Sequence, residues 1–303
     1  MKPRSKKTRP RLISKIPKDM WAFKKPTIWH GTAEKLLLHA PKRALFDLVI
    51  ASPPYNIGKR YEKSEAMARY LRRHRRILED IVSRLKPNGS LCWQVGNHVD
   101  DGEIFPLDLE FHKIFRKLGL KLRNRIIWRF GHGLHNSRRF SGRYEVILWY
   151  TKSDAYHFDL DAVRVPSKYP AKTHYKGEKR GQYSSHPLGK NPEDVWDIPN
   201  VKGNHVEKTN HPCQFPVGLV ERLVLSLTKK NAVVFDPYAG VCSAGVAALL
   251  HGRRFIGSER LKPYCKAGLK RLEDTLDNTV RYRPHDKPIY DHKNSKLSVP
   301  PAR

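Results

Sequence analysis

The stretch VVFDPYAGVCSAGVAALLHGRRFIGSE, residues 233–259, decides the fold class of this 303-residue chain. An apolar strand runs into Asp236, a turn of small residues follows, and a helix then leads to a second strand that ends at Glu259. This order is typical of a nucleotide-type cofactor site, in which Gly240 lets the backbone approach the ligand and Glu259 accepts hydrogen bonds from ribose hydroxyls. The stretch lacks a GxxxxGK[ST] sequence, so it is not a phosphate loop. Taken alone, it also fits a strand–helix–strand unit that binds nothing.

Another strand with a polar end lies upstream. The apolar run LFDLVIA at 45–51 predicts a buried strand, and Ser52-Pro53-Pro54-Tyr55 ends it because a strand cannot continue through two prolines. The prolines fix the backbone and remove two donors, which leaves carbonyl oxygens and the Ser52 hydroxyl facing a cleft at the sheet edge. Tyr55 offers a stacking face for a planar base. In isolation, an ordinary proline-containing turn is the better interpretation of these four residues.

Apolar periodicity along the rest of the chain predicts an α/β fold. We expect further strands at 90–96, 122–129 and 144–151, a helix that starts near Pro216, and helices at 69–85, 107–118, 243–251 and 261–276. Strands that alternate with helices indicate a mostly parallel sheet with helices on both faces. Residues 155–210 lack sustained periodicity and predict an irregular insertion, whereas 1–26 predict a solvated basic arm and 278–303 a charged tail.

Charge and composition restrict the class of partner. The chain has 59 Lys plus Arg against 29 Asp plus Glu, a formal net charge of +30, so nucleic acid is the natural partner and an anionic membrane surface comes second. Asp236 and Pro237 interrupt the most apolar window, 232–250, which excludes a membrane span. The 4 cysteines form no CxxC pair, which argues against a disulfide framework and a metal module and favours a reducing cytoplasm.

The order of the segments is more specific than any one of them. A strand ending in SPPY, a basic insertion, His211-Pro212-Cys213-Gln214-Phe215-Pro216, FDPYAG and IGSE together resemble the β class of S-adenosylmethionine-dependent amino-methyltransferases that act on DNA. The resemblance implies a Rossmann-like methyltransferase fold with a circularly permuted motif order. It divides the chain into an arm (1–26), a catalytic half (27–154), a target-recognition insertion (155–210), a cofactor half (211–277) and a tail (278–303).

Site residues carry over by matching position. The resemblance implies a catalytic motif made of Ser52, Pro53, Pro54 and Tyr55, and an S-adenosyl-L-methionine site made of Thr32, Phe215, Asp236, Pro237, Gly240 and Glu259. Two positions depart from the family pattern. Cys242 stands where the family loop has its second glycine, and Thr32 stands where the family has an acidic residue. Because either change can weaken cofactor binding, a non-catalytic nucleic-acid-binding protein on this fold is an alternative.

The expected reaction is methyl transfer to the exocyclic N4 amine of a cytosine flipped out of double-stranded DNA. A serine at the first motif position favours cytosine in this family, with adenine-N6 methylation as the alternative and an RNA substrate third. We expect the DNA to contact basic residues outside the catalytic motif, namely Arg129, Arg138, Arg139, Arg143, Lys168 and Lys176. The resemblance also allows a cognate restriction endonuclease as partner, and a cytoplasmic location in a prokaryotic cell or phage-infected host.

A competing motif is excluded by its context. Pro212-Cys213-Gln214 looks like the nucleophile motif of cytosine carbon-5 methyltransferases, whose thiolate attacks the ring. That chemistry needs a glutamate in an ENV sequence, which the chain lacks, and here the tripeptide precedes the cofactor loop instead of following it. We therefore interpret it as a coincidence within HPCQFP.

Overall fold

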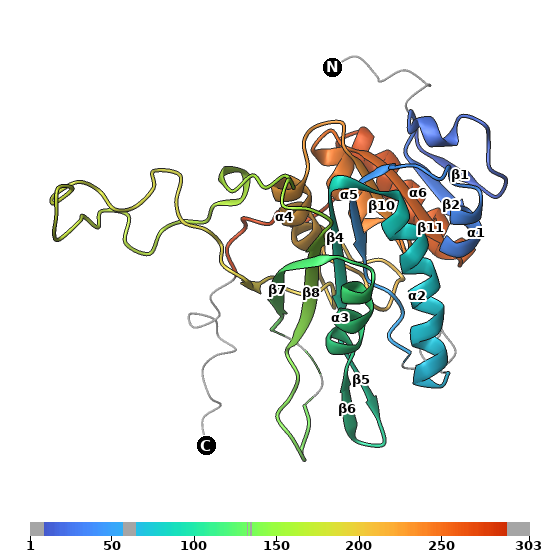
Figure 1. The fold of residues 1–303 in the computed structure, drawn as a ribbon, viewed down its shortest axis with the longest axis horizontal. Coiled ribbons are helices and arrows are strands. Elements are labelled where there is room, and N and C mark those ends of the chain that lie inside the picture. The colour runs from blue at the N-terminus through green and yellow to red at the C-terminus, as the bar shows by residue number, and fades with distance from the viewer. Residues whose placement is uncertain (1–8, 57–64, 132, 134, 290–303) are drawn as a thin grey trace.

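The computed structural model of the chain describes residues 9–56, 65–131, 133 and 135–289. At the centre of this described part lies a 9-stranded sheet with the order β1-β2-β11-β10-β3-β4-β8-β7-β9 (Figure 1). In chain order its strands are β1 (Arg11–Ile13), β2 (Thr27–His30), β3 (Phe46–Ala51), β4 (Leu85–Val95), β7 (Lys121–Arg129), β8 (Tyr144–Thr151), β9 (Val195–Asp197), β10 (Val233–Asp236) and β11 (Arg254–Glu259). Neighbours from β1 to β4 pair in parallel, whereas β8 runs antiparallel to both β4 and β7.

Helices cover both faces of the sheet, as the alternation of segments predicts. One face carries α1 (Ala33–Leu38), α2 (Met67–Arg84) and α3 (Leu107–Lys117), whose apolar side chains share a buried cluster with Phe46 of β3. The other face carries α4 (Val217–Leu227), α5 (Ser243–Leu250) and α6 (Lys262–Leu276), which bury Leu48 of the same strand. Two 3-10 turns (Met20–Ala22 and Asp161–Val163) and a hairpin of β5 (Asn97–Asp100) and β6 (Glu103–Pro106) complete the described elements. No helix in these described residues is both long and apolar enough to cross a membrane.

The predicted fold class is confirmed, including its permuted order. β3 comes from the first half of the chain and β10 from the last third, yet they are parallel neighbours in the middle of the sheet. Their carboxyl ends therefore meet at one edge, which places Ser52 beside Asp236. Most predicted helices and strands agree with the structure to within a residue or two.

The N-terminal segment contradicts the prediction of a solvated arm over 1–26. Arg11–Ile13 form the edge strand β1, paired in parallel with Thr27–Trp29 of β2. Met20 is 1% exposed and Phe23 is also buried, both in the core that faces α1. Short apolar anchors between prolines leave no periodicity in the sequence, which explains why this packing was missed. Residues 1–8 lie outside the described residues.

Three other segments differ from expectation. β4 begins at Leu85, so Lys86-Pro87-Asn88-Gly89 lies within a strand and Lys86 pairs with Asp47 of β3, Nζ to Oδ1, at 2.8 Å. Residues 280–288 pack against α4 and its surroundings instead of forming a free tail, since the His285 amide donates to Glu221 at 2.8 Å. The insertion 155–210 is mostly irregular, but Trp196 of β9 is buried. Its segment 165–190 extends far from the sheet as an arm (Figure 1).

The burial of Met20 gives a test of the N-terminal packing. Met20→Ala should lower the free energy of unfolding by about 2–5 kcal/mol, because it removes a buried side chain that the core cannot fully replace. Urea unfolding measures the loss, and Lys24→Ala in the same segment, where the side chain is exposed, is the matched control. Equal stability of the two variants would contradict the packing of Met20 in the core and would support the prediction of a solvated arm.

Candidate functional site

A single cleft of ≈ 890 Å³ collects the residues that the sequence assigned to catalysis and cofactor binding. It opens where β2, β3, β10 and β11 end at their carboxyl edge. Its lining includes all of the predicted members of both sets, namely Thr32, Ser52, Pro53, Pro54, Tyr55, Phe215, Asp236, Pro237, Gly240 and Glu259. The volume is in the range of small-molecule sites, and residues far apart in sequence supply its walls.

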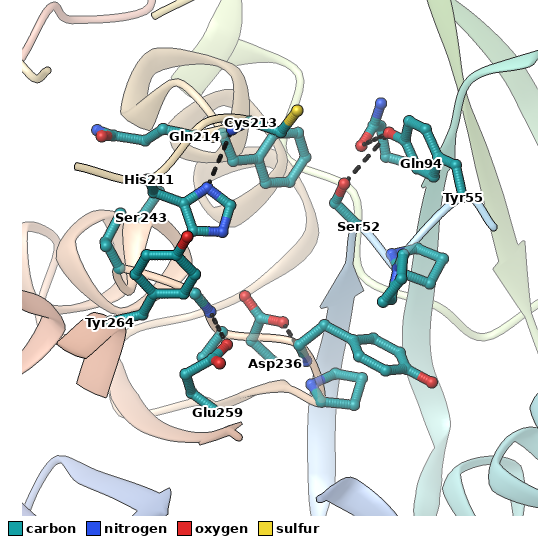
Figure 2. Close-up of a pocket in the computed structure, with 18 of the residues that line it drawn as sticks. Ser52, Tyr55, Gln94, His211, Cys213, Gln214, Asp236, Ser243, Glu259 and Tyr264 are labelled. Carbon is teal, nitrogen blue, oxygen red and sulfur yellow. Dashed lines mark hydrogen bonds between the residues drawn. The ribbon is translucent and has the colours of Figure 1, made fainter. Parts of the chain in front are cut away.

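The turn after β3 holds Ser52 and Tyr55 in fixed positions. The Tyr70 hydroxyl of α2 donates to the Pro54 carbonyl at 2.7 Å, which anchors the turn from the side. Ser52 Oγ and the Tyr55 hydroxyl lie 3.2 Å apart, and Figure 2 shows the two groups turned toward each other. The Tyr55 hydroxyl also donates to Gln94 Oε1 of β4 at 2.7 Å. Burial raises the pKa of Tyr55 well above its usual value, so the phenol stays protonated.

The loop after β10 presents backbone donors and carboxylates to the cleft. Gly240 has φ +50°, a backbone conformation that favours glycine. A Cβ at this position would lie 3.3 Å from His211 Nε2, so glycine also allows His211 to approach the loop closely. The Gly240 amide donates to Glu259 Oε2 at 3.0 Å (Figure 2). The Leu261 amide donates to the other oxygen, Oε1, at 2.7 Å. The Glu259 carboxylate is thereby fixed, while each oxygen keeps a lone pair for a ligand hydroxyl.

Asp236 is the most perturbed acid of the cleft. Burial raises its pKa to about 7, the amide of Tyr238 at 2.9 Å from Oδ1 opposes that rise, and the charge of Glu259 adds to it. Burial also raises the pKa of Glu259. Two desolvated carboxyl groups on one cleft floor favour a ligand that brings positive charge or hydroxyl donors. Within the described residues, no group of three or more His, Cys, Asp or Glu side chains is placed to hold a metal ion.

The wall opposite this floor comes from the segment 211–215. The His211 ring packs on Tyr264 of α6 with 4.5 Å between ring centroids, and the Cys213 amide donates to His211 Nδ1 at 3.2 Å (Figure 2). Gln214 ties the segment to the interior by donating to the Glu207 carbonyl at 2.7 Å. In the sequence, His211 stands out only as part of the hexapeptide HPCQFP, and Tyr264 gives no signal because it lies in a helix after Glu259.

The two departures from the family pattern have structural explanations. Cys242 has φ +61° and ψ +39°, the left-handed conformation that a glycine would adopt there, and its side chain is buried against Gly268 of α6 instead of crowding the cleft. The Thr32 side chain caps α1 by accepting a hydrogen bond from the Lys35 amide at 3.4 Å. Thr32 lines the cleft, and its role in cofactor binding remains a prediction.

None of the basic residues predicted to bind DNA lines the cleft in the described part of the chain. Arg129 forms an ion pair with Asp197 of β9, and Arg139 donates to the Gly102 carbonyl at 2.7 Å. Lys168 lies on the arm formed by 165–190, 5.4 Å from the centre of the Tyr169 ring. Arg138, Arg143 and Lys176 also lie in the irregular segments 130–143 and 155–194. The DNA contacts of all of these residues remain predictions.

Several charged or polar residues of the cleft were missed, among them Arg69, Arg73, Gln94 and Glu145. Arg69 and Arg73 lie in the predicted helix 69–85, and Gln94 and Glu145 lie in the predicted strands 90–96 and 144–151. Gln94 in SLCWQVG and Glu145 in YEVILWY are polar residues within apolar strands. This pattern could have revealed them, because a polar residue in a buried strand usually has a hydrogen-bond partner. Their side chains meet because β4 and β8 are antiparallel neighbours.

Comparisons with known proteins agree with the fold. Residues 46–270 match the DNA methylase family of N6 and N4 methyltransferases. The chain is 47% identical over 277 residues to the Type II methyltransferase M.BglII of Bacillus subtilis, covering 91% of this chain and 76% of that protein. The PvuII DNA methyltransferase, a cytosine-N4-specific enzyme, superimposes with a TM-score of 0.64 at 18% identity over 86% of this chain and 94% of its own. A Thermus thermophilus protein in complex with S-adenosyl-L-methionine gives a TM-score of 0.57 at 25% identity, over 82% of this chain and 95% of its own.

The left-handed backbone at Cys242 makes a stability prediction. Cys242→Gly should change the free energy of unfolding by less than about 1 kcal/mol, because relief of the left-handed strain offsets the loss of a small buried side chain. Cys265→Gly is the matched control, since Cys265 is equally buried but lies in the right-handed helix α6, where glycine adds its own cost of about 1 kcal/mol. Urea unfolding of both variants distinguishes the positions, and equal losses would contradict the role assigned to the backbone.

Proposed function

This chain belongs to the DNA methylase family of amino-methyltransferases, and from that premise we propose that it methylates the N4 amine of a cytosine flipped out of duplex DNA. S-adenosyl-L-methionine is its cofactor. The observation that carries the proposal is the shared cleft, in which the Ser52 hydroxyl faces the same space as Asp236 and Glu259. A base on one side and a cofactor on the other would meet at the carboxyl ends of β3 and β10.

The cleft suits the cofactor by charge and by shape. Glu259, held by two backbone amides, is placed to accept hydrogen bonds from ribose hydroxyls. Asp236 offers a buried carboxylate for the cationic end of the cofactor, and the missing Cβ of Gly240 leaves room beside His211. When bound, S-adenosyl-L-methionine supplies a methyl group already activated by a positive sulfonium. The protein therefore contributes mainly positioning and electrostatics.

Ser52 and the backbone of its motif prepare the nucleophile. The lone pair of an exocyclic amine is delocalised into the ring, which makes the amine a poor nucleophile. Ser52 and Pro53 line the cleft. In this proposal Ser52 Oγ and the Pro53 carbonyl accept the two amine hydrogens, which favours a pyramidal nitrogen with its lone pair free. No covalent intermediate with the protein is needed: as the amine nitrogen bonds to the methyl carbon, the S–C bond would break to leave a neutral thioether, and the cationic amine would then give one proton to water. The Tyr55 ring lines the same space and is the proposed platform for the flipped base.

Sequencing of modified bases tests the reaction and the target atom together. DNA from cells that express the chain should contain N4-methylcytosine in one sequence context, and DNA from cells that express Ser52→Ala should contain none. The variant should still bind cofactor, because Ser52 is assigned to the amine. N6-methyladenine in place of N4-methylcytosine would identify the adenine alternative, and unmodified DNA would favour a non-catalytic binding protein. Methylation of one short site would also fit a partner endonuclease, which the Type II class of M.BglII supports.

The basic face of α2 is proposed as a phosphate-binding surface beside the cleft. Arg69 and Arg73 line the cleft itself, and Arg72 and Arg76 continue the stripe along the exposed side of the helix. α2 begins close to the edge where the cleft opens, so a duplex that delivers a base to Ser52 passes this stripe. Phosphate contacts of this kind supply affinity without reading sequence.

The raised pKa of Asp236 predicts that cofactor binding depends on pH. A cationic ligand favours the ionised carboxylate, which in the free protein forms only as the pH rises through about 7. The affinity for S-adenosyl-L-methionine should therefore rise with pH up to about 7 and then level off, with a slope of up to about tenfold per pH unit below it. Calorimetric titration of the parent and of Asp236→Asn measures this. Asp236→Asn should bind the cofactor more weakly, and its affinity should no longer rise with pH through this carboxyl group. An affinity of the parent protein that stays constant from pH 5.5 to 7.5 would contradict the role of Asp236.

The α2 stripe predicts a change in the salt dependence of DNA binding. The double variant Arg72→Gln/Arg76→Gln should reduce the slope of log affinity against log salt by about 1.8, which is about 0.9 for each lost phosphate contact. Lys229→Gln/Lys230→Gln is the matched control, because both lysines are exposed just before β10, at the opposite edge of the sheet from the cleft. Filter binding to a random duplex at several salt concentrations gives the slopes. An equal change of slope in both double variants would contradict the proposal that α2 binds DNA phosphates.

A further inference from the structure

A chain of hydrogen bonds runs from Ser52 away from the cleft and ends at a carboxylate. Ser52 Oγ lies 3.2 Å from the Tyr55 hydroxyl, which lies 2.7 Å from Gln94 Oε1 and 3.2 Å from Glu145 Oε2. Gln94 Nε2 contacts the same Glu145 oxygen. The residues come from the turn after β3, from β4 and from β8, and Gln94 and Glu145 are two residues out of register on antiparallel strands. Neither Gln94 nor Glu145 belongs to the catalytic or cofactor residues predicted from the sequence.

The direction of each hydrogen bond in this chain follows from the chemistry of its last member. An ionised carboxylate only accepts hydrogen bonds, so Gln94 must direct its amide nitrogen toward Glu145. The reversed amide would place two acceptor oxygens against each other. Gln94 Oε1 therefore faces Tyr55, and it too can only accept.

Tyr55 passes this direction on to Ser52. The phenol has one hydrogen, and its two partners deeper in the chain are both acceptors, so that hydrogen is committed to them. The remaining contact of the phenol oxygen, with Ser52, must then be one in which Tyr55 accepts and Ser52 donates. Burial and the nearby charge of Glu145 raise the pKa of Tyr55, which keeps its hydrogen in place.

We propose that Glu145 is a positioning residue that fixes Ser52 as a hydrogen-bond acceptor toward the substrate amine. With its own hydrogen turned to Tyr55, Ser52 offers only lone pairs to the cleft. A serine that donated to the amine nitrogen would occupy the lone pair that must attack the methyl group. A serine that accepts leaves this lone pair free and draws on an N–H instead. The inference rests on the proposed function, but it holds for a cytosine or an adenine amine alike, since each carries two N–H groups.

Gly96 provides the space in which this arrangement forms. A Cβ at Gly96 would lie 3.0 Å from Cε2 of Tyr55 and 3.4 Å from Cγ of Glu145. Gly96 follows β4 directly, so the end of that strand sets how closely the Tyr55 ring and the Glu145 side chain approach each other. The Gly96 backbone thus lies close to both the Tyr55 ring and the Glu145 side chain. A fixed backbone next to these two side chains favours their fixed positions, which a positioning role requires.

A double-mutant cycle tests the inference. Glu145→Gln keeps the size of the side chain but lets the Gln94 amide reverse, so the single-turnover rate of methyl transfer at saturating cofactor and DNA should fall about tenfold, the scale of one hydrogen bond. The affinities for cofactor and DNA should change little, and Glu145→Asp should recover part of the rate. In a Tyr55→Phe background, Glu145→Gln should have no further effect, because Glu145 acts only through the phenol. Glu110→Gln on α3, outside the cleft lining, is the matched control and should leave the rate unchanged.

The outcomes that overturn the inference are separate from failure of the proposed function. A wild-type rate for Glu145→Gln, or an equal fractional loss in the Tyr55→Phe background, would show that Glu145 does not act through Tyr55. Gln94→Met gives a second route should Glu145→Gln fold poorly in thermal unfolding: it should slow transfer in the parent and add nothing in Tyr55→Phe, and any other result contradicts the chain. If the wild-type protein methylates neither cytosine nor adenine amines, the proposed function itself fails.

Discussion

The parallel pairing of β3 with β10 is the contact on which the site depends. Leu48 and Val49 pair with Val234 and Phe235, residues that are nearly two hundred positions away in sequence. Asp47 strengthens the junction by accepting a hydrogen bond from the Val233 amide at 2.8 Å, and the rings of Phe46 and Phe235 stack with centroids 4.5 Å apart. Because Ser52 and Tyr55 come from one half of the chain and Asp236 and Glu259 from the other, neither half contains the complete cleft. Pairing between strands so far apart in sequence forms slowly, because the entropy of closing the loop is lost before the stabilising contacts form.

Charge is distributed differently in the cleft and on the surface. The chain as a whole carries a net charge of +30, yet the cleft is lined by the carboxyl groups of Asp236, which is buried, and Glu259, which is half-buried. Solvent and salt screen the surface charges within about 8 Å at physiological ionic strength, whereas these two carboxyl groups are screened much less. Asp236 and Glu259 therefore place acidic groups on one part of the cleft lining, whereas Arg69 and Arg73 of α2 bring basic groups to another part.

The sequence predicted those parts of the site that follow from local pattern. SPPY after an apolar strand and FDPYAG before a helix each indicate a strand end, and a parallel sheet brings strand ends to one edge. The pairing of Gln94 with Glu145 could not be predicted, because it depends on the register of two antiparallel strands and not on spacing along the chain. The same reason hid Met20, which is buried through contacts with distant helices. At Cys242 the pattern indicated a departure, but only the backbone angle showed that the loop keeps its shape.

The shape of the insertion limits how DNA recognition can be divided among its parts. The arm at 165–190 is held internally by isolated bridges and by hydrogen bonds of its turns, exposes Tyr169, Tyr175 and Tyr183, and points away from the sheet (Figure 1). Ordering such a segment on a duplex costs conformational entropy, so base contacts made by the arm must exceed that cost before they add affinity. The segment 130–143 is tied instead to the β5–β6 hairpin, where Arg139 donates to Gly102. A side chain anchored in this way loses less conformational entropy on binding a ligand than a side chain on the arm.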